Sequence, residues 1–344
     1  MRLKIPIAHI LKAQRRWEKT LRTVTATSRK LITKPRKTRP KKSRLTEVNS
    51  FGSNPGNLRM LTYVPPELLN GAALVVVLHG CMQTARDYDE GSGWSMLAKR
   101  HGFALVYAEQ SQANNPNRCF NWFQSHDARR GSGEALSIRQ MVMRIRRAHS
   151  IDPARIFITG LSAGGAMASV MLATYPEVFA GGGIIAGLPY GAANGMRHVM
   201  SAMKRPQGRS AQQWGDLVRS ASSYTGPRPT VSIWHGMEDR TVAASNAAAL
   251  LSQWANVLGV SEEVFTQTTL AGHRQRTWSN RQGATIIELY LIDGMGHGTP
   301  VRRTKAQARA GGAGPFMLDV GISSSLHLAK SWGLVRRKTA SHRT

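Results

Sequence analysis

The sequence predicts an α/β protein in which helices cover both faces of a mostly parallel sheet. Two observations lead to this prediction. Short, continuously apolar segments such as Ala73–Leu78 have the composition of parallel strands that are buried on both faces. Longer segments between them, such as 135–149, place apolar residues at three- and four-residue steps, as an amphipathic helix does. Strands that alternate with helices in this way are typical of a parallel sheet.

The other elements are expected where the same two patterns recur along the chain. A strand at 58–64 opens the series, and the Gly-rich segment 181–186 is interpreted as a strand of small residues. The segment 189–229 breaks the alternation and is interpreted as a small cap insertion. The remaining expected strands are 103–108, 155–159, 230–234 and 285–291, and the remaining expected helices are 94–101, 163–175 and 243–258.

Composition sets limits on the class of protein. Of the 344 residues, 41% are hydrophobic and 19% are charged, which is typical of a globular chain with a buried core and excludes a disordered, collagen-like or coiled-coil chain. No segment approaches the roughly 18 apolar residues that a membrane-spanning helix needs. The two cysteines exclude a disulfide-dense scaffold and a multi-cysteine zinc site.

Charge separates the N-terminal segment from the rest of the chain. Lys and Arg number 47 against 19 Asp and Glu, a formal net charge of +28, and residues 1–50 carry half of it. Residues 1–31 have the spacing of an amphipathic helix, and 34–44 resemble a solvated basic linker. Lys4, Pro6, His9 and Lys12 interrupt the apolar run that an ordinary signal peptide would need. We therefore expect a basic extension at 1–50, a catalytic domain at 51–336 and a basic tail at 337–344.

A candidate nucleophile lies in the motif Gly-Leu-Ser-Ala-Gly at 160–164. A predicted strand precedes the motif and a predicted helix follows it, which is the context of the sharp turn that exposes the nucleophilic serine of an α/β-hydrolase fold. In that turn Ser162 would carry the reactive hydroxyl. The alternative is a Gly-rich turn with a structural serine.

A nucleophilic serine needs a histidine as general base and an acid that orients the histidine. In this fold class the chain order is serine, acid, histidine, and each follows a strand. Asp239 follows the strand 230–234 and His297 follows 285–291, so we assign Asp239 as the acid and His297 as the base. The alternatives are Glu238 and Asp293 for the acid and His235 and His273 for the base.

The oxyanion hole needs two convergent backbone amides. Ala163 directly follows the candidate nucleophile and would supply one of them. His79-Gly80-Cys81 follows the strand 73–78, and the amide of Cys81 would supply the other. The side chain of His79 either borders the substrate pocket or packs to close the strand.

With these residues in place, the sequence from about Tyr63 to Trp332 resembles the polyhydroxybutyrate depolymerase family of α/β-hydrolase esterases. The resemblance assigns the same roles to Ser162, Asp239, His297 and Cys81. The motifs that carry it are Leu-His-Gly-Cys-Met-Gln at 78–83, Asn-Arg-Cys-Phe-Asn-Trp-Phe at 117–123, Gly-Glu-Ala-Leu-Ser-Ile at 133–138, Ile-Thr-Gly-Leu-Ser-Ala-Gly-Gly at 158–165, Trp-His-Gly-Met-Glu-Asp-Arg-Thr-Val at 234–242, Gly-Met-Gly-His-Gly at 294–298 and Asp-Val-Gly-Ile-Ser-Ser at 319–324.

The resemblance implies further features near this site. It implies a disulfide between Cys81 and Cys119, whereas the sequence alone is equally compatible with two buried thiols. The resemblance also implies that Trp122 forms a wall of the acyl pocket. The alternative is that Trp122 packs in the core. Secreted polymer-degrading members are expected to carry a polymer-binding domain after the catalytic part. Because the sequence ends soon after Trp332, a soluble or oligomeric ester is the expected substrate.

The sequence therefore predicts a serine esterase of the polyhydroxybutyrate depolymerase type that acts on hydroxyalkanoate or related carboxylic esters, without a cofactor or a metal. A feruloyl or acetyl-xylan esterase is the alternative among hydrolases. From another class, the alternative is a surface-binding protein whose residues 1–50 dock on an anionic membrane or a polymer granule, and binding of nucleic acid is not expected. The family resemblance favours an extracellular or periplasmic location, whereas the lack of an ordinary signal peptide leaves an intracellular location as the alternative.

Overall fold

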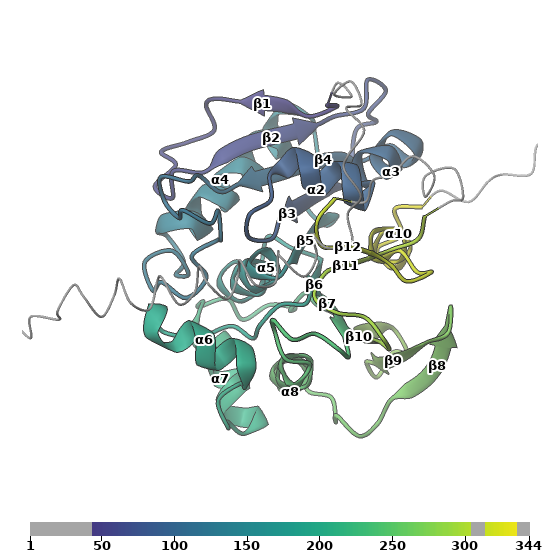
Figure 1. Cartoon of the computed structure of the whole chain (residues 1–344). Helices are drawn as coiled ribbons and strands as arrows, with labels where there is room; N and C mark the ends of the chain where they lie inside the picture. Colours follow the sequence, from purple (N-terminus) through teal and green to yellow (C-terminus); the bar gives the residue numbers. More distant parts are fainter. Residues whose placement is uncertain (1–42, 304–313, 336–344) are drawn as a thin grey trace, which may run out of the picture.

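A ten-stranded sheet forms the centre of the computed structural model, which describes residues 43–303 and 314–335 (Figure 1). In spatial order its strands are β1 (Thr46–Val48), β2 (Arg59–Tyr63), β4 (Ala104–Glu109), β3 (Leu74–Leu78), β5 (Ile156–Leu161), β6 (Gly181–Ile185), β7 (Thr230–Gly236), β10 (Thr285–Ile292), β9 (His273–Ser279) and β8 (Thr266–Leu270).

The strands in the middle of the sheet, from β4 to β10, run parallel to one another. Two antiparallel strands continue the sheet on each side, β2 and β1 at one edge and β9 and β8 at the other. The predicted fold class is confirmed, and each predicted strand lies within a few residues of its expected place. The sequence did not predict β1, β8 or β9.

Helices cover both faces of the sheet because side chains alternate along each strand (Figure 1). On β3, the side chains of Leu74, Val76 and Leu78 face the core layer that includes α4 (Gly133–Ala148), α5 (Ala163–Thr174) and, further along the sheet, α8 (Ser245–Leu258). Val75 and Val77 face the opposite way and pack with α2 (Ala85–Ser92), α3 (Trp94–His101) and α10 (Ser324–Ser331).

The segment 189–229 connects β6 to β7 and contains α6 (Met196–Lys204) and α7 (Ala211–Ser220). The helix α7 begins at a capping box in which Ser210 and Gln213 satisfy each other's backbone N–H groups. The amide of Gln253 on α8 donates hydrogen bonds to the carbonyls of Tyr190 and Trp214. These bonds fasten the insertion to α8, beside which α6 and α7 lie in Figure 1.

The strand β1 lies inside the segment 1–50 that the sequence analysis treats as an extension. Thr46, Glu47 and Val48 pair with β2, so the ordered sheet begins a few residues before the predicted boundary at residue 51. The predicted N-terminal helix and the basic tail at 337–344 lie outside the described residues.

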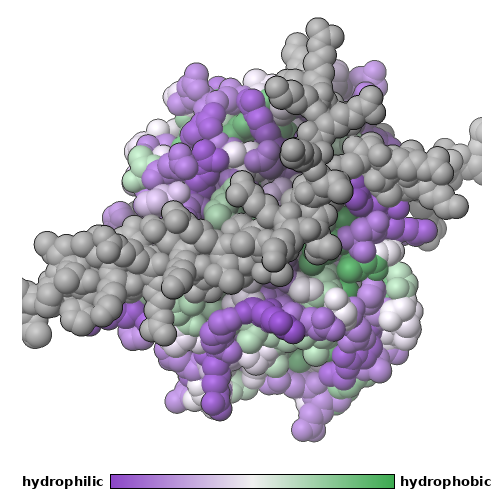
Figure 2. All heavy atoms as spheres, viewed as in Figure 1, coloured by the Kyte–Doolittle hydropathy of each residue, from purple (hydrophilic) through white to green (hydrophobic). Residues whose placement is uncertain are grey.

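No helix in the described ranges has the length and apolar character needed to cross a membrane. Hydrophilic residues cover much of the face in Figure 2, and hydrophobic residues appear there in scattered patches.

Candidate active site

The parallel strands place all the candidate catalytic residues at one edge of the sheet. Ser162 directly follows β5, Asp239 follows β7, and His297 follows β10. The loop with His79, Gly80 and Cys81 follows β3. Because parallel strands present their carboxyl ends at the same edge, these loops gather there, where open α/β sheets bind ligands.

Ser162 lies at a sharp turn between β5 and α5, with φ of 57° and ψ of −116°. A residue other than glycine with a positive φ is rare and strained. Here a hydrogen bond from the N–H of Ser162 to the carbonyl of Ile185 (2.8 Å) holds the backbone in this conformation. Two glycines allow the turn to close. A Cβ atom on Gly160 would lie 2.4 Å from the backbone of Gly164, and one on Gly164 would lie 2.5 Å from the carbonyl oxygen of Leu78.

Asp239 and His297 form a hydrogen-bonded pair. Nδ1 of His297 donates to Oδ2 of Asp239 at 2.7 Å, and both side chains are almost fully buried. The other oxygen, Oδ1, accepts from the N–H groups of Thr241 (2.8 Å) and Val242 (2.9 Å). Burial raises the pKa of Asp239, but the neighbouring His297 and His235 and the N–H of Val242 outweigh it, so the pKa lies below its usual value. Asp239 is thus an ionised carboxylate that fixes the orientation of the His297 ring.

The alternative acids and one alternative base lie elsewhere. Asp293 is exposed and pairs with Arg274 at 2.9 Å. Glu238 is exposed as well. His273 lies at the start of β9, where its Nε2 bonds to the carbonyl of Val320 (2.8 Å). Within the described residues, no side-chain hydrogen bond or ion pair joins any of these three to Asp239 or His297.

His235, the second alternative base, is close to the pair but is fully buried. Its Nε2 bonds to the carbonyl of Val242 at 2.9 Å and lies 3.6 Å from Oδ2 of Asp239. Burial lowers the pKa of His235 and keeps the ring neutral. The side chain therefore supports the loop that holds Asp239 and has no access to a substrate.

Cys81 and Ala163 border the same pocket as Ser162, as oxyanion donors must. A disulfide joins Cys81 to Cys119 and so ties the loop after β3 to the loop after β4. The N–H of Met82 also donates to the carbonyl of Asn117 (2.7 Å), and this bond holds the two loops together beside the disulfide.

The assignment of the His79 side chain to the substrate pocket is wrong. The ring is fully buried, packs against Phe120 and does not border the pocket. The N–H of Gln110 donates to Nε2 of His79 at 3.1 Å, so Nδ1 carries the proton and donates to the carbonyl of Gly80 (2.7 Å). His79 therefore braces the oxyanion loop from behind, as the packed alternative expects.

A buried carboxyl group organises the loop that follows β4. Glu134, at the start of α4, accepts hydrogen bonds from the side-chain amide of Gln110 and from the N–H of Asn121 (2.8 Å). The same amide of Gln110 donates to the carbonyl of Cys119 (3.1 Å). Burial, followed by the nearby charge of Asp127, raises the pKa of Glu134 to about 8. This network holds Cys119 and the residues around it in place.

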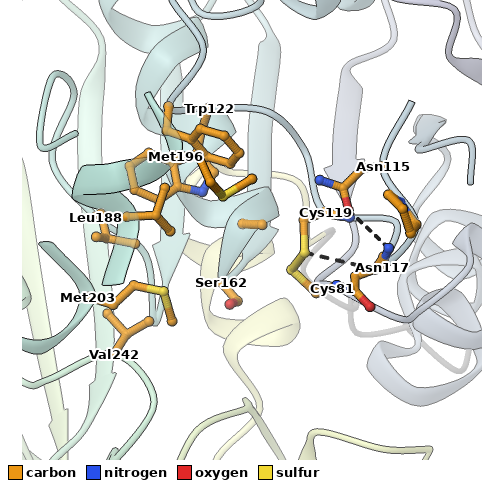
Figure 3. A pocket seen from close by; sticks show the side chains of 14 residues that line it. Cys81, Asn115, Asn117, Cys119, Trp122, Ser162, Leu188, Met196, Met203 and Val242 are labelled. Carbon is orange, nitrogen blue, oxygen red and sulfur yellow. Dashed lines mark hydrogen bonds between the residues drawn. A yellow bond between two sulfur atoms is a disulfide. The ribbon is translucent and has the colours of Figure 1, made fainter. Parts of the chain in front are cut away.

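A narrow, mainly apolar pocket of about 50 Å³ opens beside Ser162 (Figure 3). Trp122 lines it, as the family resemblance implies, and its ring packs at a right angle against Phe123. The sequence analysis did not identify the rest of the lining, to which α6 contributes one face. These further residues are Asn115, Pro116, Asn117, Phe123, Leu188, Met196, Val199, Met203 and Val242. The apolar spacing of Met196, Val199 and Met203 on α6 is the one signal in the sequence that could have indicated it.

Comparisons with known proteins find relatives among esterases. A family model described as "Esterase PHB depolymerase" matches residues 58–277. "Poly(3-hydroxyalkanoate) depolymerase C" of Paucimonas lemoignei is 46% identical over 85% of this chain and 70% of its own length. An acetylxylan esterase of Coprinopsis cinerea is 33% identical over 77% of this chain and 71% of its own length.

Among solved structures, an acetyl xylan esterase from Aspergillus awamori is similar to this protein with a TM-score of 0.70 and 25% identity. The likeness covers 85% of this chain and 99% of that one. The family model covers well over half of this chain, and the depolymerase is related along most of it. The chain therefore belongs to the esterase family of PHB depolymerases.

Proposed function

We propose that this protein is a serine esterase that hydrolyses poly- or oligo(3-hydroxyalkanoate) esters through an acyl-enzyme intermediate. Its family makes it a carboxylic ester hydrolase. The observation that best supports the mechanism is the 2.7 Å bond between His297 and Asp239, at the same sheet edge as the strained turn that carries Ser162.

In this mechanism Oγ of Ser162 attacks the ester carbonyl carbon. Nε2 of His297 carries no proton when Nδ1 donates to Asp239, so it takes the hydroxyl proton and then gives it to the leaving alcohol. The carboxylate of Asp239 stabilises the imidazolium, and the amides of Ala163 and Cys81 bind the oxyanion. A water molecule then loses a proton to His297 and attacks the acyl carbon. The bond from that carbon to Oγ of Ser162 breaks, the acid is released, and His297 returns the proton to Oγ.

The experiment that tests this proposal compares the wild type with Ser162→Ala on 4-nitrophenyl butyrate and on 3-hydroxybutyrate oligomers. Loss of the nucleophile should lower kcat by about 10⁴-fold or more and leave the fold intact, as judged by circular dichroism. Wild-type activity on the simple ester alone would indicate a general or aryl esterase. No activity in a folded wild type, or full activity in the variant, would contradict the mechanism.

The second candidate is a carbohydrate esterase, and the likeness to the whole acetyl xylan esterase of Aspergillus awamori favours it. The same catalytic residues would serve both reactions, so the two functions differ only in the pocket. The mainly apolar walls of the pocket, which include Leu188, Met203 and Val242, suit the aliphatic acyl group of a hydroxyalkanoate. Rates on acetylated xylan, feruloyl esters and 3-hydroxybutyrate oligomers at equal ester concentration distinguish the candidates.

The location and the role of the basic N-terminal segment are also proposals. The disulfide between Cys81 and Cys119 supports an extracellular or periplasmic location, because disulfides persist in oxidising compartments. The charge of residues 1–50 supports adsorption to an anionic membrane or granule surface. Replacing the Lys and Arg residues between 34 and 42 by Gln in the full chain should release it from vesicles and granules. Equal binding of the two proteins in a sedimentation assay would contradict this role.

A further inference from the structure

The insertion between β6 and β7 carries a large excess of positive charge. Six of its residues are Lys or Arg, and Asp216 is its single acid. That acid already pairs with Arg219 on α7 at 2.8 Å. Arg197, Lys204 and Arg205 are exposed, and no ion pair joins any of them to an acid that the structure describes.

The helix α6 combines this charge with a wall of the pocket. Met196, Val199 and Met203 recur at three- and four-residue steps, so they share one face of the helix, and all three line the pocket (Figure 3). Arg197 and Lys204 are seven residues apart, which places them together on the adjacent face of α6. The apolar wall of the pocket is therefore bordered by a cationic surface.

The C-terminal end of α6 also contacts the loop that carries the catalytic acid. The N–H of Ala243 donates to the carbonyl of Met203 at 2.8 Å. Nζ of Lys204 donates to the carbonyl of Arg240, the residue directly after Asp239. Arg240 is exposed, and within the described ranges its guanidinium forms no ion pair. This contact adds a further cation to the surface at the edge of the pocket.

Little negative charge balances these cations. Asp239 binds His297, and the exposed Glu238 forms no ion pair within the part of the chain that the structure describes. Positive charges that lie together without counter-ions repel one another, and an approaching anion relieves that repulsion. A surface of one sign beside a cleft also raises the local concentration of an oppositely charged substrate. The field extends over about 8 Å at physiological ionic strength, and Lys204 directly follows a residue that lines the pocket.

A free-acid fragment of a polyester is an anion that fits this surface. Each cleavage of the polyester releases a new carboxyl group, whose pKa of about 4 leaves it ionised near neutral pH. The fragment therefore carries a carboxylate at its end. The interior of the polymer and simple esters such as 4-nitrophenyl butyrate carry no charge, so a cationic surface does not attract them.

We propose that Arg197, Lys204, Arg205 and Arg240 form a cationic surface that attracts the terminal carboxylate of an oligoester and so guides the oligoester to the pocket. The preferred substrate class is then the free-acid oligomer of a 3-hydroxyalkanoate rather than a neutral ester. The inference rests on the proposed function, because it specifies which esters the same catalytic residues hydrolyse fastest.

The test measures kcat/KM of the full chain on the free-acid trimer of 3-hydroxybutyrate and on its terminal amide, which has the same ester bonds but no charge. The screening length is about 30 Å in 0.01 M salt and about 3 Å in 1 M salt, so the wild-type ratio of acid to amide should fall by about tenfold or more between them. A ratio that does not change with salt would overturn the inference, while hydrolysis of the amide would still support the proposed function.

A triple variant, Arg197→Gln with Arg205→Gln and Arg240→Gln, removes most of the surface. It keeps Lys204, whose hydrogen bond holds α6 to the loop of the catalytic acid. At low salt the acid-to-amide ratio of this variant should fall close to the wild-type ratio at high salt, with circular dichroism as the check of the fold. Arg240→Glu alone should lower the ratio more than Arg240→Gln, because it reverses the charge instead of removing it.

The matched control removes three charges at the opposite edge of the sheet. Lys99, Arg100 and Arg147 are exposed near the C-terminal ends of α3 and α4, from which the chain leads into β4 and β5. Replacing all three by Gln changes the net charge by the same amount and should leave the ratio at the wild-type value. An equal fall in this control would overturn the inference in favour of net charge alone. A wild type that cleaves 4-nitrophenyl butyrate but neither trimer would overturn the polyester function, and the inference with it.

Discussion

Asp239 has hydrogen-bond partners on both of its carboxylate oxygens. Oδ1 is fixed by two backbone N–H groups of its own loop, which leaves Oδ2 directed at His297. Nearby, His235 holds the carbonyl of Val242 in place. A carboxylate with this many partners stays ionised and keeps a single orientation, which a histidine base requires.

Replacing Asp239 by Asn should lower kcat by about 10⁴-fold, because an amide cannot stabilise the imidazolium and favours the wrong histidine tautomer. The measurement is steady-state hydrolysis of 4-nitrophenyl butyrate. The matched control is Asp293→Asn, which breaks an exposed ion pair with Arg274 and should leave kcat unchanged. If Asp293→Asn abolished activity and Asp239→Asn did not, the assignment of the acid would be wrong.

Residues at the ends of strands could be predicted from the sequence, whereas pocket residues could not. Ser162, Asp239 and His297 each follow an apolar strand, so chain order and strand position were enough to propose them. Trp122 came from family resemblance. Met196 and Met203 belong to an insertion whose packing depends on α8, and Asn117 depends on a disulfide that spacing alone does not reveal. The His79 side chain was misassigned because its partner Gln110 lies on another loop.

At the scale of elements, the N-terminus of α4 positions the loop that carries Cys119 and Trp122. Glu134 reaches from the helix into the sheet edge and binds both Gln110 and Asn121. Because the group is fully buried, its protonation state is coupled to folding.

The pKa of Glu134 is about 8 in the folded chain, against an ordinary value of 4.5. Between these values the folded protein retains a proton that the unfolded chain has lost, so the stability contributed by this group falls as pH rises through that window. Gln at this position has no proton to lose. We therefore expect the melting temperature of the wild type, relative to that of Glu134→Gln, to be lower at pH 8.5 than at pH 5.

Thermal unfolding of both proteins across this pH range measures the effect, and other titrating groups cancel in the difference. Ester hydrolysis at each pH shows whether the loop that follows β4 loses its shape when the fold loses stability. A melting-temperature difference that does not change with pH would contradict the coupling of Glu134 to stability.

Among the elements that the sequence did not predict, β1, β8 and β9 lie at the edges of the large sheet. The strand β8 reads Thr-Gln-Thr-Thr-Leu and is mostly exposed, and β9 begins with five polar residues in succession. Edge strands contact the core little, so they lack the continuous apolar run that marked β3 and β4. The helix α2 is polar too, although its capping box at Thr84 and Asp87 is a readable start signal.

At the scale of the whole molecule, one covalent bond connects the loops of two neighbouring strands. The cysteines are 38 residues apart in the sequence, and a cross-link over such a distance reduces the entropy of the unfolded chain by an equivalent of about 4 kcal/mol. The same bond holds the oxyanion loop and the loop that follows β4 together. Stability and activity should therefore both depend on it.

Replacing both cysteines by Ala should lower the free energy of unfolding by about 2–4 kcal/mol and reduce kcat/KM on all esters. Urea denaturation and ester hydrolysis measure the two effects. Dithiothreitol should lower the stability and the activity of the wild type and leave those of the double variant unchanged. The double variant therefore controls for effects of the reductant elsewhere in the protein. Wild-type activity that persists at full rate after complete reduction would show that the loops hold their shape without the bond.

The strained turn at Ser162 has a consequence for the evolution of this protein. A non-glycine residue at φ of 57° costs about 1–3 kcal/mol, and glycine adopts this conformation without that cost. Ser162→Gly should therefore be at least as stable as Ser162→Ala, although glycine normally weakens a folded chain. Selection for heat resistance alone would favour glycine at this position and yield a durable but inactive protein, so only selection for catalysis maintains the serine.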